Sequence, residues 1–324
     1  MPSEGRARFA VTGRIPAPAL FLLREAGAVA LADTEAPLPR PELLRLVAGA
    51  DAILTLLHTR VDAELLDAAG PGLRCVANVA VGYDNVDLRA AASRGVAVSN
   101  TPGVLDDATA DLTLGLILAA ARRLGEGERL IRSGAPWAWG MSFMLGRDLR
   151  GKLLGLVGLG SIGRRVAERA RAFGMRIAYN ARRPADLTLC AALGAERMEL
   201  EALLAAADVL SLHCPLTPET HHLISAERLA LMKPGSILVN AARGPIVDEA
   251  ALVGALRDGP LAAAALDVYE REPAVHPGLL ALENAVLVPH LGSATVETRR
   301  AMAELAARNA IAAVRGEPLL TPVS

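Results

Sequence analysis

The sequence has few cysteines, little net charge and no long hydrophobic run, and each scarcity excludes a class of protein. Three cysteines occur among 324 residues, and Cys75, Cys190 and Cys214 are too widely spaced for a disulfide framework or a metal-ligand motif. We therefore expect no metal site and a reducing, cytoplasmic location. The formal net charge of −1 gives no electrostatic reason to expect a nucleic-acid or membrane partner.

The longest hydrophobic run, Leu112 to Ala121, is also too short for a bilayer, which requires about 20 apolar residues in a helix. Residues Met1 to Phe9 contain no apolar segment typical of a signal peptide. Hydrophobic residues nevertheless make up 52% of the chain, as expected of a well-buried globular protein. The length favours two domains over one.

Short apolar runs alternate with helical patterns over residues 7 to about 100. The predicted strands are Phe9–Thr12, Ala28–Leu31, Ala52–Leu57 and Arg74–Val79, and the predicted helices are Ala17–Ala26, Pro41–Ala48 and Ala63–Ala69. This alternation is typical of a parallel sheet with helices on both faces. Because the region has no phosphate-type glycine motif, we expect it to be a substrate domain.

A glycine-rich turn follows the apolar run Leu153–Val157. Gly158, Gly160 and Gly163 have the spacing Gly-x-Gly-x-x-Gly, and a helical pattern continues to Phe173. In a strand–turn–helix unit the first glycine closes the turn, the second admits a pyrophosphate, and the third lets the helix pack closely. The helix start offers free N–H groups to the phosphates. An ordinary glycine turn is the alternative to this Rossmann-type dinucleotide site.

Further strands are predicted downstream, and each is followed by polar residues. These strands are Arg176–Tyr179, Val209–His213, Ser236–Asn240, Ala263–Asp267 and Ala285–Val288. Ligands of an open parallel sheet bind beyond the carboxyl ends of its strands. Asn180 stands where a carboxylate would bind the ribose of NAD, and Arg182 and Arg183 follow it. Because a guanidinium can bind a 2′-phosphate, we predict NADP in preference to NAD. A solvated basic turn that tolerates NAD is the alternative.

Arg243, Glu272 and His290 follow the last three predicted strands. A guanidinium can hold a carboxylate or carbonyl oxygen, and a histidine beside a carboxylate can donate a proton. Alone, His290 would be a structural histidine and Glu272 a surface charge, but together the three residues are suited to reducing a keto acid. Asp248 precedes a helical pattern and is expected to cap it.

Several of these segments resemble the D-isomer-specific 2-hydroxyacid dehydrogenase family. They are Val79–Asp87, Thr101–Asp111, the Gly158 turn, His213–Thr220, Asn240–Asp248, Leu266–Pro273 and Pro289–Ala294. Thr12–Pro16 and Trp139 further resemble the glyoxylate/hydroxypyruvate reductase branch. The resemblance implies reduction of a small 2-oxo acid, glyoxylate or hydroxypyruvate, to the D-2-hydroxy acid by hydride transfer from NAD(P)H.

The resemblance also assigns roles to residues. It makes Arg243, Glu272 and His290 catalytic, with His290 as proton donor. The implied substrate residues are Val81 and Gly82, through their backbone amides, Arg243 and Trp139. The implied cofactor residues are Gly158, Gly160, Ser161, Ile162, Gly163, Asn180, Arg182, Arg183, Cys214, Pro215, Thr220, Ala241, Asp267 and Gly292.

The expected architecture is two doubly wound α/β domains. Residues 1–102 and 293–324 form a flavodoxin-like substrate domain, which the predicted last helix, Val296–Val314, completes. Residues 103–292 form the Rossmann-type domain, and within it residues 104–150 supply a dimerisation helix and arm. The helix is predicted over Ala108–Arg123, apolar on all sides, and residues 125–150 are predicted to be irregular. A helix that is apolar on all sides is buried either in a core or in a subunit interface. In the family that the sequence resembles, this helix and arm usually form the dimer, so the resemblance implies a homodimer.

Other functions stay open at this point. An NAD-linked D-3-phosphoglycerate or D-lactate dehydrogenase is the nearest alternative, since His58, Thr59 and Arg60 at a predicted strand end are compatible with a phosphate-bearing substrate. A non-catalytic, nucleotide-sensing protein that resembles a corepressor is more remote. Such a protein would not require the complete set of Arg243, Glu272 and His290.

Overall fold

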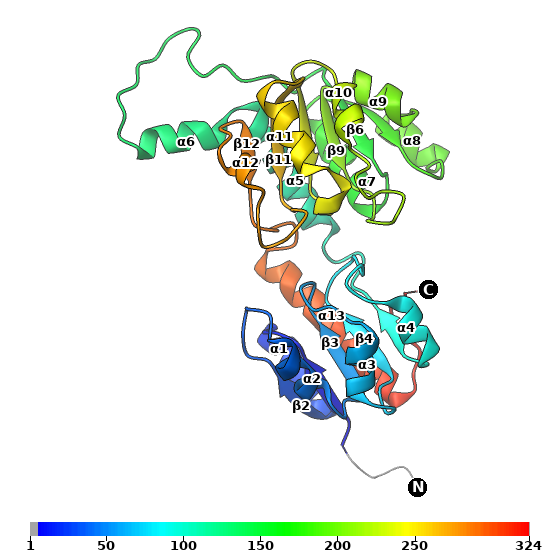
Figure 1. Ribbon diagram of the computed structural model, residues 1–324. Helices are drawn as coiled ribbons and strands as arrows, with labels where there is room; N and C mark the ends of the chain where they lie inside the picture. The colour runs from blue at the N-terminus through cyan, green and yellow to red at the C-terminus, as the bar shows by residue number, and fades with distance from the viewer. Residues whose placement is uncertain (1–5, 324) are drawn as a thin grey trace. The chain divides into compact units, whose positions relative to one another are not determined.

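The computed structural model describes residues 6–323, which form two units with one parallel sheet each (Figure 1). Unit 1 contains the described residues up to Leu105 and from Ala294 onward, and unit 2 contains Asp106–Ser293. In each unit, helices cover both faces of the sheet. The predicted α/β class with two doubly wound sheets is therefore confirmed.

The sheet of unit 1 has five strands in the order β2-β1-β3-β4-β5, which is the flavodoxin-like order. The strands are β1 (Arg8–Val11), β2 (Ala28–Leu31), β3 (Ala52–Thr55), β4 (Cys75–Asn78) and β5 (Ala97–Ser99). The helices are α1 (Ala17–Ala26), α2 (Arg40–Val47), α3 (Ala63–Ala69), α4 (Leu88–Ser93) and α13 (Val296–Arg315). The last helix, α13, packs on α1, β3 and β4, so the C-terminal segment completes the unit that the N-terminal segment begins.

The sheet of unit 2 has seven strands in the order β12-β11-β10-β9-β6-β7-β8. The strands are β6 (Leu153–Val157), β7 (Arg176–Asn180), β8 (Ala195–Arg197), β9 (Val209–Leu212), β10 (Ser236–Asn240), β11 (Leu261–Leu266) and β12 (Ala285–Leu287). The order reverses between β6 and β9, and this reversal is where dinucleotides bind in Rossmann-type sheets. The glycine turn follows β6 directly.

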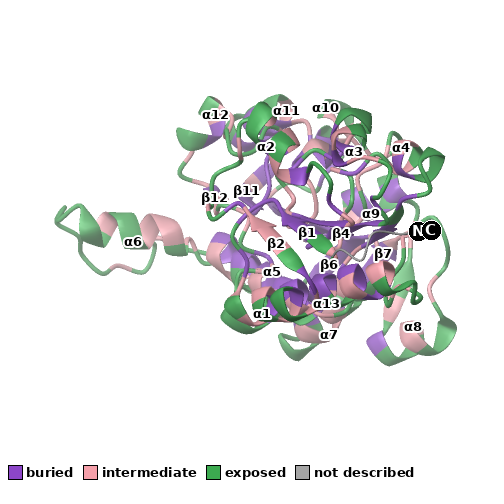
Figure 2. Ribbon diagram, turned by 90° about the horizontal axis from the view of Figure 1, so that it is seen from below, coloured by how far each residue is buried: buried purple, intermediate pink, exposed green. Residues whose placement is uncertain are grey.

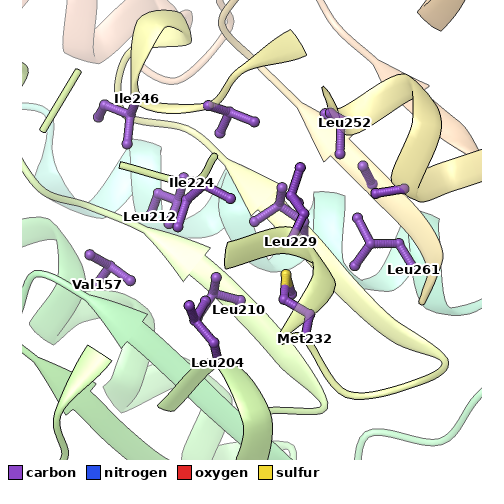
Figure 3. Close-up of a cluster of buried hydrophobic side chains, with 14 of the residues drawn as sticks. Val157, Leu204, Leu210, Leu212, Ile224, Leu229, Met232, Ile246, Leu252 and Leu261 are labelled. Carbon is purple, nitrogen blue, oxygen red and sulfur yellow. The ribbon is translucent and has the colours of Figure 1, made fainter. Parts of the chain in front are cut away.

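Unit 2 contains α-helices and one 3₁₀ turn, most of which lie on one or the other face of its sheet. They are α5 (Asp106–Ala121), α6 (Leu124–Arg132), α7 (Ser161–Ala172), α8 (Leu187–Leu193), α9 (Leu200–Ala206), α10 (Ala226–Ala230), the 3₁₀ turn η1 (Gly244–Ile246), α11 (Glu249–Arg257) and α12 (Pro277–Leu280). On one face of the sheet, the side chains of Val157 and Leu210 pack in a core with α9, α10 and α11. On the other face, those of Leu156 and Val209 pack in a core with α5 and α7. This alternation follows from the two-residue period of a strand. Figure 3 shows part of the first core.

The inner strands of both sheets are thus buried on both faces, whereas the edge strands β2, β8 and β12 are less buried and the outer surfaces of the helices are exposed (Figure 2). This pattern explains why the strands have nearly continuous apolar sequences. No helix among the described residues is long and apolar enough to cross a membrane.

The structure corrects one prediction and adds short elements. Residues 125–150 were expected to be irregular, but α6 covers Leu124–Arg132. Gly125 and Gly127 obscure that helix in the sequence because glycine disfavours helices. The added elements are α4, β5 and β8, of which β5 and β8 have only three residues each.

Candidate functional site

The glycine turn after β6 has the local geometry that its three glycines suggest. Gly158 has φ +98°, and a Cβ there would lie 2.7 Å from the carbonyl oxygen of His213. A Cβ on Gly163 would lie 2.3 Å from the oxygen of Gly158. In contrast, a Cβ on Gly160, the N-cap of α7, would meet no atom within 4 Å. Two glycines therefore serve close packing and one leaves open space before a helix of twelve residues.

The residues at the end of β7 present basic side chains to solvent. Asn180 donates its side-chain N–H to the carbonyl of Met198 at 2.9 Å, which directs the amide toward the neighbouring chain segment. Arg182 and Arg183 are exposed. Arg197 on β8 donates to the carbonyl of Ala181 at 3.1 Å and so lies against the same turn.

The loop after β9 is held by its own hydrogen bonds. Thr220 Oγ1 donates to the carbonyl of Pro215 at 2.7 Å and accepts from the N–H of Thr217 at 2.7 Å. Burial raises the pKa of the Cys214 thiol to about 11, so this group is a neutral thiol rather than a nucleophile. Burial also lowers the pKa of His213 to about 4, and its Nε2 lies 2.8 Å from Ser211 Oγ.

The turn after β10 carries Arg243. The buried side chain of Asn240 accepts from the N–H of Ala242 at 3.1 Å and donates to the carbonyl of Arg243 at 2.9 Å. The Arg243 guanidinium donates to the carbonyl of Ala242 at 2.8 Å. Ala241 lies half-buried within this turn. Asn240 thereby fixes the backbone from which Arg243 extends.

His290 and Glu272 form a hydrogen-bonded pair, with 2.8 Å between Nδ1 and Oε2. Their side chains are 29% and 36% exposed, so the pair is accessible to a small molecule. Burial favours the neutral carboxyl of Glu272, but the hydrogen bond and charge of His290 outweigh it and lower the Glu272 pKa. The pair is therefore a carboxylate beside an imidazole.

The backbone of His290 is held in the left-handed region, with φ +53°. Its N–H donates to the carbonyl of Asp267 at 2.8 Å, and the Asp267 carboxylate accepts from the N–H groups of Leu291 and Gly292. Burial raises the pKa of Asp267, against the opposing effect of these two N–H groups. Both carboxylate oxygens of Asp267 thus fix the segment that presents His290. A positive φ in a residue other than glycine, as at His290, is frequent at functional sites.

Tyr269 was not predicted from the sequence to be a site residue, although it lies within the segment Leu266–Pro273. Its N–H donates to Glu272 Oε1 at 3.0 Å, and its hydroxyl donates to the carbonyl of Val288 at 3.0 Å. Burial raises the pKa of this phenol to about 12, so it remains a donor. Tyr269 connects the Glu272 loop to the strand end before His290.

The remaining predicted residues lie elsewhere. Val81 and Gly82 follow β4 in unit 1, where their carbonyls accept from the side chains of Asn100 and Asn78 at 2.9 and 2.8 Å. Trp139 is 78% exposed in the segment beyond α6, which extends away from the sheet of unit 2 (Figure 1). The site therefore unites Arg243, Glu272 and His290 on one sheet edge but leaves Trp139 in the arm.

Asp248 accepts from the N–H of Ala251 at 2.9 Å and caps α11, as predicted. Among residues 6–323 there is no group of three or more His, Cys, Asp or Glu side chains that could hold a metal ion. The site thus offers a guanidinium, an imidazole and carboxylates, a set able to bind an anion and transfer a proton.

Most of the chain is similar to known sequences. The profile of the family "D-isomer specific 2-hydroxyacid dehydrogenase, NAD binding domain" matches residues 114–292. A glyoxylate reductase of Thermococcus onnurineus is 50% identical over 313 residues, covering 95% of this chain and 92% of that protein. A glyoxylate reductase of Aeropyrum pernix is 50% identical over 319 residues, covering 96% and 94%.

Solved structures agree with these similarities. A Thermus thermophilus protein superposes with a TM-score of 0.91 and 49% identity, covering 98% of this chain and 100% of that chain. An NADPH-dependent glyoxylate/hydroxypyruvate reductase from Sinorhizobium meliloti, solved with NADP and malonate, gives a TM-score of 0.87 and 37% identity, covering 99% and 97%.

Proposed function

Because this chain belongs to the D-isomer specific 2-hydroxyacid dehydrogenase family and is an oxidoreductase, we propose that it reduces glyoxylate or hydroxypyruvate to the D-2-hydroxy acid with NADPH. The observation that carries the proposal is the pairing of Glu272 and His290 at 2.8 Å beside the turn of Arg243. The choice of substrate is supported by relatives named glyoxylate reductase, which are 50% identical over nearly the whole chain.

The residues of unit 2 fit a nicotinamide dinucleotide. The open space at Gly160 and the free N–H groups at the start of α7 suit a pyrophosphate. Ser161, Ile162 and Gly163 form the first turn of that helix, and the loops of Cys214, Pro215 and Thr220, of Ala241, and of Asp267 and Gly292 follow neighbouring strands. When bound, the nicotinamide supplies the hydride that reduces carbon 2 of the substrate.

We propose NADP as the preferred cofactor, with NAD also possible. Asn180 is neutral and does not repel a 2′-phosphate, and the exposed Arg182 and Arg183 can pair with one. The relative from Sinorhizobium meliloti, described as NADPH-dependent, supports this preference.

The chain's own groups account for the remaining chemistry. Arg243 holds the substrate carboxylate and polarises its carbonyl. Protonated His290 gives its proton to the forming alkoxide, and Glu272 keeps the imidazole oriented and favours its charged form. Such a proton donor contributes about 10²–10⁴ in rate.

We propose that unit 1 is the substrate domain, with the backbone amides of Val81 and Gly82 binding the substrate carboxylate. Residues 104–150 are proposed to form the contact of a homodimer. Five large apolar side chains of the arm, Trp137, Trp139, Met141, Phe143 and Leu145, are 39% to 82% exposed, an unusual amount for a monomer surface. Sedimentation should therefore give twice the mass of the chain. We propose a cytoplasmic location, which agrees with three cysteines that are all free.

The test is the oxidation of NADPH and of NADH by the purified protein with glyoxylate, hydroxypyruvate, pyruvate and phosphohydroxypyruvate. Fast turnover of the first two with NADPH supports the proposal. Preference for NADH would overturn the cofactor assignment alone. Preference for phosphohydroxypyruvate or pyruvate would favour a D-3-phosphoglycerate or D-lactate dehydrogenase. Nucleotide binding without turnover of any substrate would favour the nucleotide-sensing alternative.

A further inference from the structure

Two glutamates behind the catalytic pair bind one another's backbone. The N–H of Glu249, the first residue of α11, donates to Glu270 Oε1 at 2.7 Å. In return, the N–H of Glu270 donates to Glu249 Oε1 at 2.7 Å. These residues are 21 positions apart, so the two bonds join separate segments of the chain. We call this pair the glutamate clasp.

The clasp joins the two segments that carry the catalytic groups. Glu249 follows the turn that begins at Arg243, and Glu270 lies two residues before Glu272. Between them the backbones touch, because a Cβ on Gly244 would lie 1.9 Å from the carbonyl of Tyr269. A displacement at the clasp would therefore change the distance between the Arg243 turn and the Glu272 loop.

A histidine adds a third contact. His222 Nε2 lies 3.3 Å from Glu270 Oε1, the same oxygen that accepts from Glu249. The N–H of His222 donates to the carbonyl of Pro245 at 2.8 Å, so this residue also contacts the turn after Arg243. Glu249 is only 6% exposed, and this burial raises the pKa of its carboxyl, against the smaller opposing effect of His276 at the start of α12.

We propose that Glu249 and Glu270, supported by His222, are positioning residues that hold Glu272 in place for His290. In this proposal they touch neither substrate nor cofactor. They act through the Tyr269–Glu272 loop, in which the N–H of Tyr269 donates to Glu272 Oε1. The inference rests on the proposed roles of Glu272 and His290. A small misplacement of a catalytic group can cost up to about a hundredfold in rate.

The test follows the ring of His290 directly. Protein labelled at histidine carbon is titrated by NMR, and the His290 signal is assigned by its loss in His290→Ala. In Glu249→Ala and Glu270→Ala we expect the ring to lose its proton at lower pH than in the wild type, as in Glu272→Gln. Glu249→Gln and Glu270→Gln keep an oxygen acceptor for the opposite N–H and should stay near the wild type.

Measurements of kcat, nucleotide affinity and thermal stability distinguish a loss of positioning from a loss of folding. We expect kcat to fall about tenfold or more in the two alanine variants, with the Kd of NADPH little changed. Glu227→Ala, which removes an exposed first-turn glutamate of α10, serves as the matched control. If Glu249→Ala does not fold because Glu249 is buried, Glu270→Ala alone tests the proposal, because the side chain of Glu270 is 23% exposed and its replacement should be tolerated.

Folded alanine variants with unchanged titration of His290 would overturn the clasp, whatever their melting temperatures. A wild-type protein that turns over no 2-oxo acid would overturn the proposed function instead. The NMR comparison would still decide whether the clasp sets the Glu272–His290 pair, since it requires no turnover.

Discussion

His290 Nδ1 and Glu272 Oε2 lie 2.8 Å apart, although the two residues are 18 positions apart in the chain and neither belongs to a helix or strand. Their meeting depends on backbone bonds at both ends: Asp267 fixes the segment of His290, and Tyr269 fixes Glu272. The pair is therefore positioned by hydrogen bonds at the ends of β11 and β12.

His290→Ala should remove most of the reductase activity. The loss of a positioned proton donor lowers kcat by about 10²–10⁴, while the glycine turn that binds the nucleotide is unaffected. Steady-state kinetics and the Kd of NADPH measure the two effects. Glu227→Ala, which removes an exposed first-turn glutamate of α10, is the control and should retain activity. Equal turnover of His290→Ala and wild type would remove His290 from the mechanism.

Glu272→Gln should move the alkaline limb of the pH–rate profile for reduction to lower pH. Reduction requires a protonated imidazole, and the Glu272 carboxylate stabilises that form, as its own lowered pKa indicates. Removing the charge makes the proton leave at lower pH, so activity falls earlier as pH rises. The measurement is kcat/KM between pH 5 and 10. A profile that keeps its alkaline limb in place would contradict the pairing.

Gly160→Ala and Gly163→Ala should fail in different ways. A methyl group on Gly163 would collide with the oxygen of Gly158 at 2.3 Å, so we expect a free energy of unfolding lower by about 1–3 kcal/mol without any nucleotide. A methyl group on Gly160 meets open space, so stability should hold while the Kd of NADPH rises. Thermal unfolding and calorimetric titration test both. Unchanged nucleotide affinity in Gly160→Ala would argue against a pyrophosphate at that point.

Arg182→Ala should weaken NADPH without weakening NADH. A charge-assisted hydrogen bond is worth about 1.5–3 kcal/mol, which corresponds to a rise in the KM of NADPH of roughly tenfold to a hundredfold. Arg176→Ala, at the opposite end of β7, is the matched control and should change neither value. Equal loss for both nucleotides would show that Arg182 does not read the 2′-phosphate.

Regular elements and strand ends were predictable because they depend on local patterns. The alternation of strands and helices identified both sheets, and the ends of β10, β11 and β12 located Arg243, Glu272 and His290. β5 and β8 were not predicted because three-residue strands give too little periodicity. The Glu249–Glu270 clasp was not predictable either, because its reciprocal bonds join distant backbone groups that no local pattern relates.

The passage of the chain out of unit 1 after Leu105 and back at Ala294 has a consequence for biosynthesis. During translation, all of unit 2 emerges from the ribosome before α13 does. Until then, α1, β3 and β4 lack the helix that covers them, so the unit translated first is the one completed last. Termination before residue 294 would therefore leave a complete unit 2 attached to an unfinished, apolar surface, and we expect such truncated chains to aggregate.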